Sequence, residues 1–335
     1  MSRIVCFGEL LIRLAAPARE LLLQSGRLDV HIGGAEANVA VGLASLGHHA
    51  AMVSRVPDDA LGHAAVGYLR RYGVATDGVD HGDGRMGLYF LTPGAGSRPS
   101  TIIYDRLGSS FALAEAEDFD WRSLLEGADM LHLSGVTAAL GPNSAAAALA
   151  AADAARSFGV RVSFDGNYRA QLWQRWDGDP RTVLTDLVAR ADIFFGNHRD
   201  ISLLLGREFA DDGETRRREA AEAAFDAFPQ LQLIASTARQ VDDADRNRIS
   251  ARIDARDAVH QTDEQLVAGI VDRIGAGDAF AAGVLHGMLG GTDLPTVAQY
   301  GLALACLKHS LPGDASLFTQ PDIDAFIAGE RDVRR

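Results

Sequence analysis

Short apolar runs that are typical of buried β-strands alternate along this chain with longer segments that are typical of helices. The run "RIVCFG" at residues 3–8, for example, precedes the helical pattern "AEANVAVGLASLG" at residues 35–47, and the alternation continues to a helical stretch at residues 294–309. Strands that are separated by helices pair in parallel, and the helices then cover both faces of the sheet. The pattern therefore predicts an α/β fold with a mostly parallel central sheet. Ligands are expected beyond the carboxyl ends of its strands.

Two stretches depart from this alternation, at approximately residues 11–34 and 80–110. They are rich in glycine, threonine, tyrosine and arginine, and segments such as "GLYFLT" and "STIIYDR" are typical of antiparallel strands. We expect a small β-strand lid over the ligand site; the alternative is a peripheral ornament. Residues 240–265 are polar and of mixed charge, which predicts a hairpin or an exposed loop. The sequence contains no internal repeat or low-complexity linker, so we predict one domain over residues 1–335.

Composition narrows the classes of function. The chain has 335 residues, 47% of them hydrophobic, and a net charge of −13, so nucleic acid and anionic membrane surfaces are not expected partners. The N-terminus reads as a strand and not as a signal peptide, and no apolar run predicts a membrane span. Cys6 and Cys306 both lie in apolar contexts, which favours free thiols in a reducing cytoplasm. An anionic substrate would have to bind local arginines.

Lysine usage excludes several mechanisms. Lys308 is the only lysine, and it stands in "CLKHS" without the glycine loop that a Walker A motif needs. The strand lysine of protein kinases is therefore missing. A Schiff-base enzyme would have to use Lys308 alone. The ten histidines show no HExxH or similar spacing of metal ligands.

The stretch "DRIGAGDAF" at residues 272–280 carries a chemical signal. Its loop residues are Gly275, Ala276 and Gly277. A helical pattern follows, and the N–H groups at a helix N-terminus favour negative charge. Asp278 would lie in the first turn, where its carboxylate can accept the proton of a hydroxyl that attacks a phosphoryl group. A helix cap after a flexible loop explains the same stretch equally well.

An earlier stretch, "HIGGAEANVAVGLASLG" at residues 31–47, can complete such a site. Gly33 and Gly34 allow a ligand to approach the backbone closely, and Asn38 follows one helical turn later. This early pattern and the late "GAGDAF" together resemble the ribokinase-like (PfkB-type) sugar kinases. Three further segments resemble one branch of that family, the 2-keto-3-deoxygluconate kinases. They are "FDGNYRAQLW" at 164–173, "TARQVDDADRNRISA" at 237–251 and "LKHSLPGDASL" at 307–317. The resemblance covers essentially the whole chain.

The resemblance implies a ribokinase-like three-layer α/β/α fold and an ATP-dependent kinase. Its reaction would convert 2-keto-3-deoxygluconate to 2-keto-3-deoxy-6-phosphogluconate in sugar-acid catabolism of the Entner–Doudoroff type. Asp278 would be the proton acceptor, with the loop that precedes it as the anion hole. The residues implied for the sugar acid are Gly33, Gly34, Asn38, Tyr89, Tyr104, Arg106, Arg169 and Asp314. Of these, Arg106 and Arg169 suit a carboxylate because a guanidinium can bind one bidentately.

The resemblance also implies contacts to ATP. They come from Asn197, Ser236, Thr237, Arg239, Val241, Gly275 and Gly277. Residues 240–265 would flank the adenine, although a glycine pair that many superfamily members carry in this region is absent. "NHRD" at 197–200 occupies the family's N-x-x-E segment, so Asp200, one methylene shorter than glutamate, would hold Mg²⁺ through water. Asp272 would orient the loop or contribute to a site for a monovalent cation such as K⁺, and a purely structural role explains it equally well.

Three other functions are compatible with these motifs. The first is a kinase for a neutral sugar such as fructose or ribose, and the second is a non-catalytic sugar-acid sensor. The third, a Schiff-base aldolase, is disfavoured because Lys308 lies in a helical segment. We expect a cytoplasmic protein that forms a homo-oligomer through the lid. The motifs are compatible with both gluco and galacto sugar acids.

Overall fold

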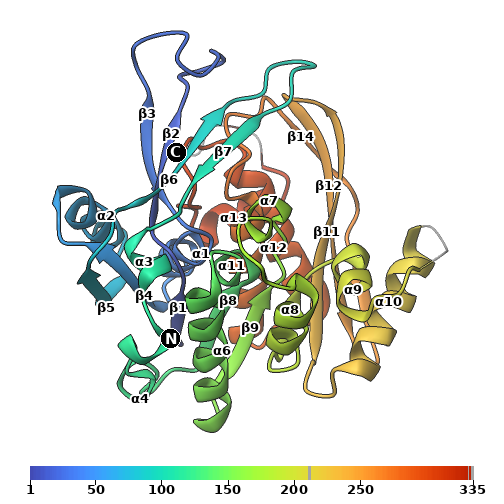
Figure 1. The fold of residues 1–335 in the computed structure, drawn as a ribbon. Helices are drawn as coiled ribbons and strands as arrows, with labels where there is room; N and C mark the ends of the chain where they lie inside the picture. Colours follow the sequence, from blue (N-terminus) through green and yellow to red (C-terminus); the bar gives the residue numbers. More distant parts are fainter. Residues whose placement is uncertain (210–212, 331, 333–335) are drawn as a thin grey trace.

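The computed structural model describes residues 1–209, 213–330 and 332, so residues 210–212, 331 and 333–335 of the predicted domain lie outside the description. Within the described part a ten-stranded sheet runs through the molecule in the order β13-β12-β11-β10-β9-β8-β1-β4-β5, with β14 also paired to β12 (Figure 1). Its strands are β1 (Arg3–Phe7), β4 (His49–Pro57), β5 (Ala75–Gly82), β8 (Met130–Ser134), β9 (Arg161–Asp165), β10 (Ile193–Phe195), β11 (Leu233–Asp243), β12 (Arg246–Ala255), β13 (Val259–Gln261) and β14 (Gln265–Ala268).

Strand direction confirms the predicted mostly parallel sheet. Neighbouring strands from β11 to β5 run parallel, whereas β12, β13 and β14 form an antiparallel edge. Every residue of the central strand β8 is buried, as expected where helices cover both faces. The carboxyl ends of β1, β8, β9, β10 and β11 therefore open toward one side of the molecule, where a ligand site is expected.

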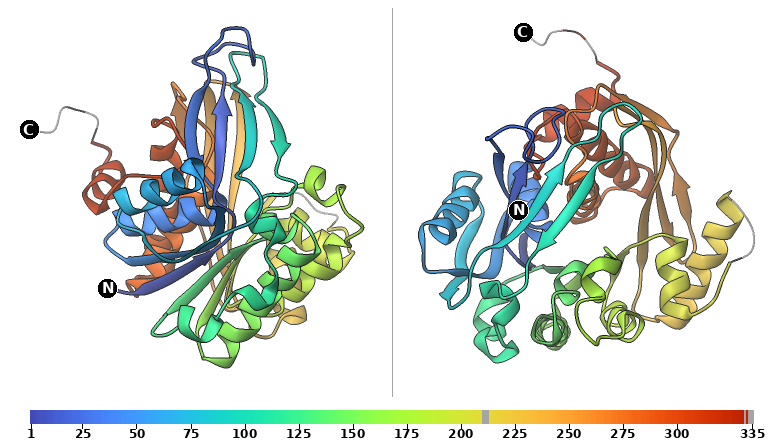
Figure 2. Two further views of the ribbon diagram at one scale, coloured as in Figure 1. Left: turned by 60° about the vertical axis from the view of Figure 1, so that its left-hand side comes forward. Right: turned by 45° about the horizontal axis from the view of Figure 1, so that its top comes forward.

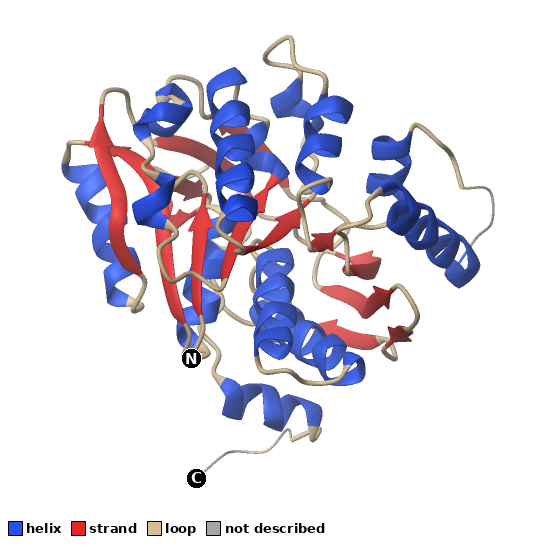
Figure 3. Ribbon diagram, turned by 90° about the horizontal axis from the view of Figure 1, so that it is seen from below, coloured by secondary structure: helices blue, strands red, loops and turns tan. Residues whose placement is uncertain are grey.

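Helices cover both faces of this sheet and form two separate hydrophobic cores with it (Figure 3). One face is covered by α1 (Ala35–Ser45), α2 (Ala60–Arg71), α11 (Ala276–Leu289), α12 (Leu294–Lys308) and α13 (Gln320–Ile327). The other face carries α3 (Ser110–Leu113), η1 (Ala116–Asp118), α4 (Trp121–Leu124), α5 (Gly135–Ala138), α6 (Pro142–Ser157), α7 (Ala170–Trp173), α8 (Pro180–Val188), α9 (His198–Leu205) and α10 (Gly213–Ala227). None of the helices described is long and apolar enough to cross a membrane.

A second, four-stranded sheet rises beside the carboxyl ends of the main sheet (Figure 2). Its order is β3-β2-β6-β7, with β2 (Leu11–Ala15), β3 (Asp29–Gly33), β6 (Gly87–Thr92) and β7 (Thr101–Asp105). The two predicted lid stretches thus form one small sheet. Within each stretch the strands pair antiparallel, as expected, whereas β2 and β6, which join the two stretches, run parallel. The chain leaves the small sheet after β3, passes through the main sheet, and re-enters at β6 in the direction of β2.

The polar stretch at 240–265 was predicted to form a hairpin or an exposed loop, and it contains a hairpin. Strands β11 and β12 pair antiparallel up to a turn at Asp243–Arg246. The turn reaches the small sheet's loop, where the Ala244 N–H donates to the Gly96 carbonyl (2.8 Å). Arg19, after β2, forms an ion pair with Asp245 (2.8 Å). The hairpin and the small sheet therefore enclose the space above the main sheet from two sides.

Candidate active site

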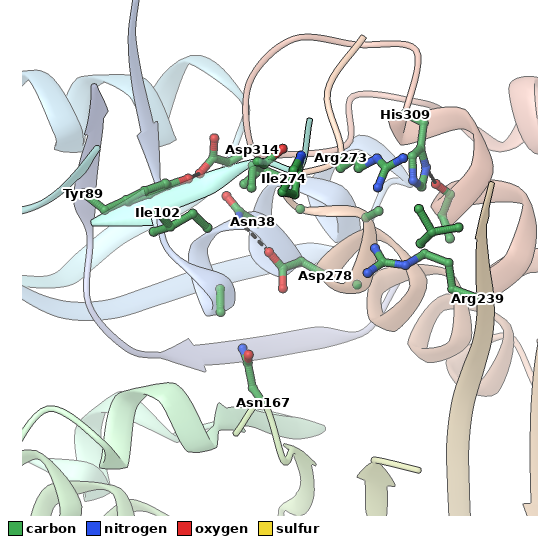
Figure 4. A pocket seen from close by; sticks show the side chains of 18 of the residues that line it. Asn38, Tyr89, Ile102, Asn167, Arg239, Arg273, Ile274, Asp278, His309 and Asp314 are labelled. Atoms are coloured by element: carbon green, nitrogen blue, oxygen red, sulfur yellow. Dashed lines mark hydrogen bonds between the residues drawn. The ribbon is translucent and has the colours of Figure 1, made fainter. Parts of the chain in front are cut away.

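A cavity of about 900 Å³ lies where the carboxyl ends of the main sheet, the small sheet and the N-terminus of α11 meet (Figure 4). Most of the predicted site residues line it. They are Gly34, Asn38, Tyr89, Tyr104, Arg106, Arg169, Thr237, Arg239, Val241, Gly275, Ala276, Gly277, Asp278 and Asp314. Four predicted residues, Gly33, Asn197, Ser236 and Asp200, are not among the described residues that line the cavity.

Asp278 lies in the first turn of α11, with Gly275 as the N-cap residue. Asn38, in α1, donates a hydrogen bond from its amide to Asp278 Oδ2 (2.7 Å). Burial raises the pKa of Asp278 to about 7, against the Asn38 hydrogen bond, which lowers it. Glu36 and Asp314 raise the pKa further, and Arg169 lowers it. A carboxylate that titrates near neutral pH is suited to accept and release a proton.

The loop before Asp278 contains two glycines, and the backbone conformation requires glycine at Gly275 only. Gly275 has φ +78°, and a Cβ atom there would stand 1.6 Å from the Asp314 carbonyl oxygen. Gly277 has no such neighbour, since a Cβ atom on it would meet nothing within 4 Å. The N–H groups of a helix's first turn have no partner within the helix, so those of Gly277 and Asp278 are available to an anion.

Cationic side chains gather on one side of Asp278. Arg239, on β11, and Arg273, just before the loop, both line the cavity, with His309 beside them (Figure 4). Burial and the nearby Arg239 lower the pKa of Arg273. Burial lowers the pKa of His309 to about 4, so its imidazole is neutral at pH 7. Two guanidinium groups beside a helix N-terminus make this end of the cavity suitable for phosphates.

Aromatic and polar side chains gather on the other side of Asp278. Tyr89 and Tyr104 are cross-strand partners in the small sheet, with ring centroids 6.4 Å apart. The Tyr89 hydroxyl donates to Asp314 Oδ2 (2.6 Å), and the carboxyl group of Asp314 occupies the space where a Cβ atom on Gly33 would stand. Gly33, which we expected to contact the sugar acid, therefore admits the Asp314 side chain instead. The other Asp314 oxygen forms an ion pair with Arg13 (3.1 Å).

The two predicted carboxylate-binding arginines differ in their surroundings. Arg106 is buried, and its Nε donates to Glu9, which also accepts from the Ser109 hydroxyl. The Nη atoms of this guanidinium are therefore the ones available to a ligand in the cavity. Arg169 is exposed at the cavity rim, and its guanidinium donates to the Tyr168 carbonyl (3.3 Å). Its charge lowers the pKa values of Asp278 and Asp165.

Asp165 is the last residue of β9, Asn167 lies two residues later, and both line the cavity opposite the loop. Burial raises the pKa of Asp165 to about 7, and the Asp278 charge raises it further. The two carboxylates therefore interact across the cavity. Asn167 has φ +36°, and its N–H donates to Asp165 Oδ1 (3.0 Å), so this tight turn presents both side chains to the site.

Three residues that we predicted to contact the nucleotide or the metal, Asn197, Asp200 and Ser236, do not line the cavity. Asn197 and Asp200 form a capping box at the start of α9, where Asp200 accepts from the Asn197 N–H (2.8 Å). Ser236 lies on β11 between Ala235 and Thr237. Successive side chains of a strand point to opposite faces, so Thr237, Arg239 and Val241 share the cavity face and Ser236 does not. Asp200 still raises the pKa of Asp165, which places its charge near the site.

Sequence reasoning missed five residues of this region. They are Glu9, Arg13, Asp165, Asn167 and Arg273. Asp165 and Asn167 stand in the quoted "FDGNYR" segment directly after a buried strand, so the rule that ligands bind at strand ends was sufficient to find them. Arg273 stands beside Asp272 at the start of the loop motif. Glu9 and Arg13 gave no local signal.

Comparisons with known proteins show the family. The family model described as pfkB family carbohydrate kinase matches residues 1–320. The chain is 30% identical over 328 residues to a 2-dehydro-3-deoxygalactonokinase of Haloferax volcanii, which covers 98% of this chain and 97% of the relative. It is 27% identical to a 2-dehydro-3-deoxygluconokinase of Bacillus subtilis, over 99% of this chain and 97% of the relative.

Solved structures give the same result. The crystal structure of a 2-dehydro-3-deoxygluconokinase from Thermotoga maritima superposes with a TM-score of 0.93 at 36% identity, over 98% of this chain and 100% of that chain. A structure of a ribokinase II from E. coli, at 19% identity, shares the fold with a TM-score of 0.83. The expected ribokinase-like fold is thereby confirmed. The chain belongs to the pfkB family of carbohydrate kinases.

Proposed function

We propose that this chain transfers a phosphoryl group from ATP to the terminal hydroxyl of 2-keto-3-deoxygluconate and releases 2-keto-3-deoxy-6-phosphogluconate. One observation carries the proposal. Asp278 lies in a single cavity between a cationic end at a helix N-terminus and an end lined by tyrosines, Asn38 and arginines. The names of the full-length relatives, which act on deoxy sugar acids, support the substrate class.

The cationic end would bind the phosphates of ATP. Backbone N–H groups of residues 275–277 would donate hydrogen bonds to the terminal phosphate, and Arg239 and Arg273 would balance its charge as it transfers. Thr237 and Val241 share the cavity face of β11 with Arg239 and would flank the nucleotide. Phosphoryl transfer depends mainly on such positioning and charge stabilisation, which these groups supply without reacting themselves.

Asp278 would accept the proton of the sugar's terminal hydroxyl. Its pKa of about 7 leaves a large fraction ionised at neutral pH, and Asn38 stabilises and orients the ionised form. The small sheet would close over the sugar acid through Tyr89 and Tyr104 and exclude water from the transferring phosphate.

Magnesium fits this cavity through Asp165. Mg²⁺ bound with ATP would supply positive charge that neutralises the phosphates. Asp165 offers a carboxylate in the cavity wall opposite the loop, either directly or through water. The nearby Asp200 would contribute through water while it caps α9, as we expected from its shorter side chain.

The acid group of the substrate would bind Arg106 and Arg169. Replacing Arg169 with alanine should raise KM for sugar acids far more than for neutral sugars, because the exposed guanidinium has no ion-pair partner among the described residues. Equal effects on gluconate-type and fructose-type substrates would exclude a carboxylate role for Arg169. Lys308 cannot serve a Schiff-base mechanism in this arrangement, because its buried ammonium group donates to the Leu311 carbonyl (3.0 Å).

The proposal is tested by measuring ADP release with Mg-ATP across sugar acids and neutral sugars. We expect the highest kcat/KM with 2-keto-3-deoxygluconate or its galacto epimer, and much lower values with fructose and ribose. A preference for fructose or ribose would assign the chain to the neutral-sugar kinases of the family. Tight sugar-acid binding without ADP release would indicate a sensor.

The proposal includes a cytoplasmic homo-oligomer. Cys6 and Cys306 are buried free thiols, and the reaction needs ATP. The face of the small sheet that points away from the cavity carries a cross-strand row of apolar residues, namely Val30, Leu14, Phe90 and Ile103. Val30 and Ile103 are 61% and 52% exposed, so a second copy of the sheet would bury apolar area there.

A further inference from the structure

A buried arginine links the small sheet to the catalytic loop. Arg13 stands in the middle of β2 and is only 1% exposed. Its Nη2 donates to Asp272 Oδ2 (2.6 Å), and its Nε lies 3.1 Å from Asp314 Oδ1. One guanidinium therefore neutralises two carboxylates, one on each side of the loop that leads to Asp278. Burial alone would lower the pKa of Arg13, but Asp314 and Asp272 outweigh it and raise the pKa.

These carboxylates hold the catalytic loop in place. Asp272 Oδ1 accepts from the Ile274 N–H (3.0 Å), and Asp272 Oδ2 accepts from the Gly313 N–H (3.1 Å). The next residue, Asp314, places its carbonyl oxygen against Gly275 so closely that no Cβ atom fits between them. A shift of Arg13 would therefore move the loop from both of its ends.

The same contacts bear on the monovalent cation that we considered for Asp272. A K⁺ ion binds by exchanging its water shell for several oxygen ligands. Asp272 Oδ2 already accepts two N–H donors, and Asp272 Oδ1 accepts one. The His309 carbonyl accepts from Val271 and Asp272, and the Leu311 carbonyl accepts from the Lys308 ammonium group.

Basic side chains also fill this region. Lys308 is fully buried, and burial lowers its pKa, although the charges of Asp272 and Asp314 partly oppose this shift. A dissolved cation would thus meet the Arg13 guanidinium, the Lys308 side chain on the Leu311 carbonyl, and Asp272 oxygens that already accept hydrogen bonds. The residues around Asp272 do not fit a K⁺ site.

We propose that Arg13 is the fixed cation of this catalytic loop: a positioning residue that replaces a dissolved monovalent cation and makes phosphoryl transfer independent of K⁺. Arginine suits this role better than lysine because its planar fork can reach two carboxylates at once. The inference rests on the proposed kinase reaction only for its activity readout.

The first test compares the unaltered enzyme in KCl and in tetramethylammonium chloride at equal ionic strength. We expect the same kcat and the same KM for ATP in both salts, because no K⁺ is needed. A kcat that rises with K⁺ and saturates would overturn the proposal.

The second test replaces Arg13. In Arg13→Met we expect kcat to fall about 100-fold, the scale of a misplacement of about 1 Å in a catalytic group. In Arg13→Lys we expect a smaller fall in kcat than in Arg13→Met, because one ammonium group can pair with only one of the two carboxylates. Added guanidinium ion should restore activity to Arg13→Met and not to Asp278→Asn. The matched control is Arg190→Met, which removes an arginine from a remote ion pair with Asp153 (2.6 Å) and should leave kcat unchanged.

Folding is measured beside activity. If Arg13→Met does not fold, Arg13→Met combined with Asp272→Asn removes one buried charge of each sign, and we expect it to fold with low kcat. Wild-type kcat in a folded Arg13 variant, or the absence of any guanidinium rescue, would contradict the positioning role. If the unaltered enzyme phosphorylates no sugar, the proposed function fails, and the thermal shift produced by ATP in the two salts still tests cation independence.

Discussion

At the scale of single residues, the proposed reaction depends most on the carboxylate of Asp278. In Asp278→Asn we expect kcat to fall by about 10²–10³, the usual scale of general base catalysis. The amide keeps the size of the side chain, so the protein should fold and bind ATP as before. The control is Asp257→Asn, at an exposed position outside the cavity, with unchanged kcat. Near-normal turnover of Asp278→Asn would refute its role as the base.

The pH dependence of the reaction follows from the same residue. The base must be ionised, so kcat/KM should rise with pH and level off above the pKa of about 7. Asp165 also has a pKa of about 7 and interacts with Asp278, so the measured midpoint belongs to the pair. In Asn38→Ala the hydrogen bond that lowers the Asp278 pKa is lost, and the midpoint should move to higher pH whatever the loss of rate. A midpoint that stays or moves to lower pH would contradict this electrostatic assignment.

Predictability from sequence also differs between residues. Asp278 and Asn38 were found because glycine motifs mark them. Arg13 and Glu9 stand in or beside "ELLIRLA", where a charged residue in a strand is typical of a solvated face. Arg13 can be buried because Asp272 neutralises its charge. Asp272 lies 259 residues further along the chain, so no local sequence pattern reveals this pairing. Asp200 was assigned to Mg²⁺ from its motif, although the side chain of an aspartate three residues after Asn197 is also well placed to cap a helix.

At the scale of elements, the two glycines of the loop before α11 differ in role: we expect Gly275 to matter for folding and Gly277 for ATP binding. Gly275→Ala should lower the free energy of unfolding by at least roughly 1–3 kcal/mol, the cost of a left-handed conformation for a residue with a side chain. Contact with the Asp314 carbonyl adds to this cost. Gly277→Ala should unfold like the unaltered protein, because its Cβ would meet open space, and should bind ATP more weakly. Equal stability of the two variants in urea denaturation would contradict this division.

Elements were also predicted unequally. The strands and helices of the main sheet were found because buried strands are apolar at every position and helices show a longer period. The direction of β6 against β2 was not found, because it depends on how the intervening chain passes through the main sheet. Local alternation of side chains is the same in parallel and antiparallel strands.

At the scale of the whole molecule, the two faces of the small sheet predict assembly. One face carries Tyr89, Tyr104 and Arg13 toward the site, and the other carries the apolar row with Val30 and Ile103. The sheet that closes the cavity with one face is therefore also the sheet whose other face a second copy would cover. Dimerisation would therefore stabilise the closed arrangement of the lid.

We expect the unaltered protein to be a dimer by light scattering at micromolar concentration, and Ile103→Glu to be a folded monomer, because a buried unpaired carboxylate opposes association. Leu61→Glu is the matched control. Leu61 is 50% exposed on α2, similar to Ile103 at 52%, and lies outside the small sheet. The Ile103→Glu monomer should also show a raised KM for the sugar acid, since Tyr104 is the next residue of β7 and lines the cavity. An Ile103→Glu variant that remains dimeric would place the interface elsewhere, and a monomer with unchanged KM would separate assembly from lid closure.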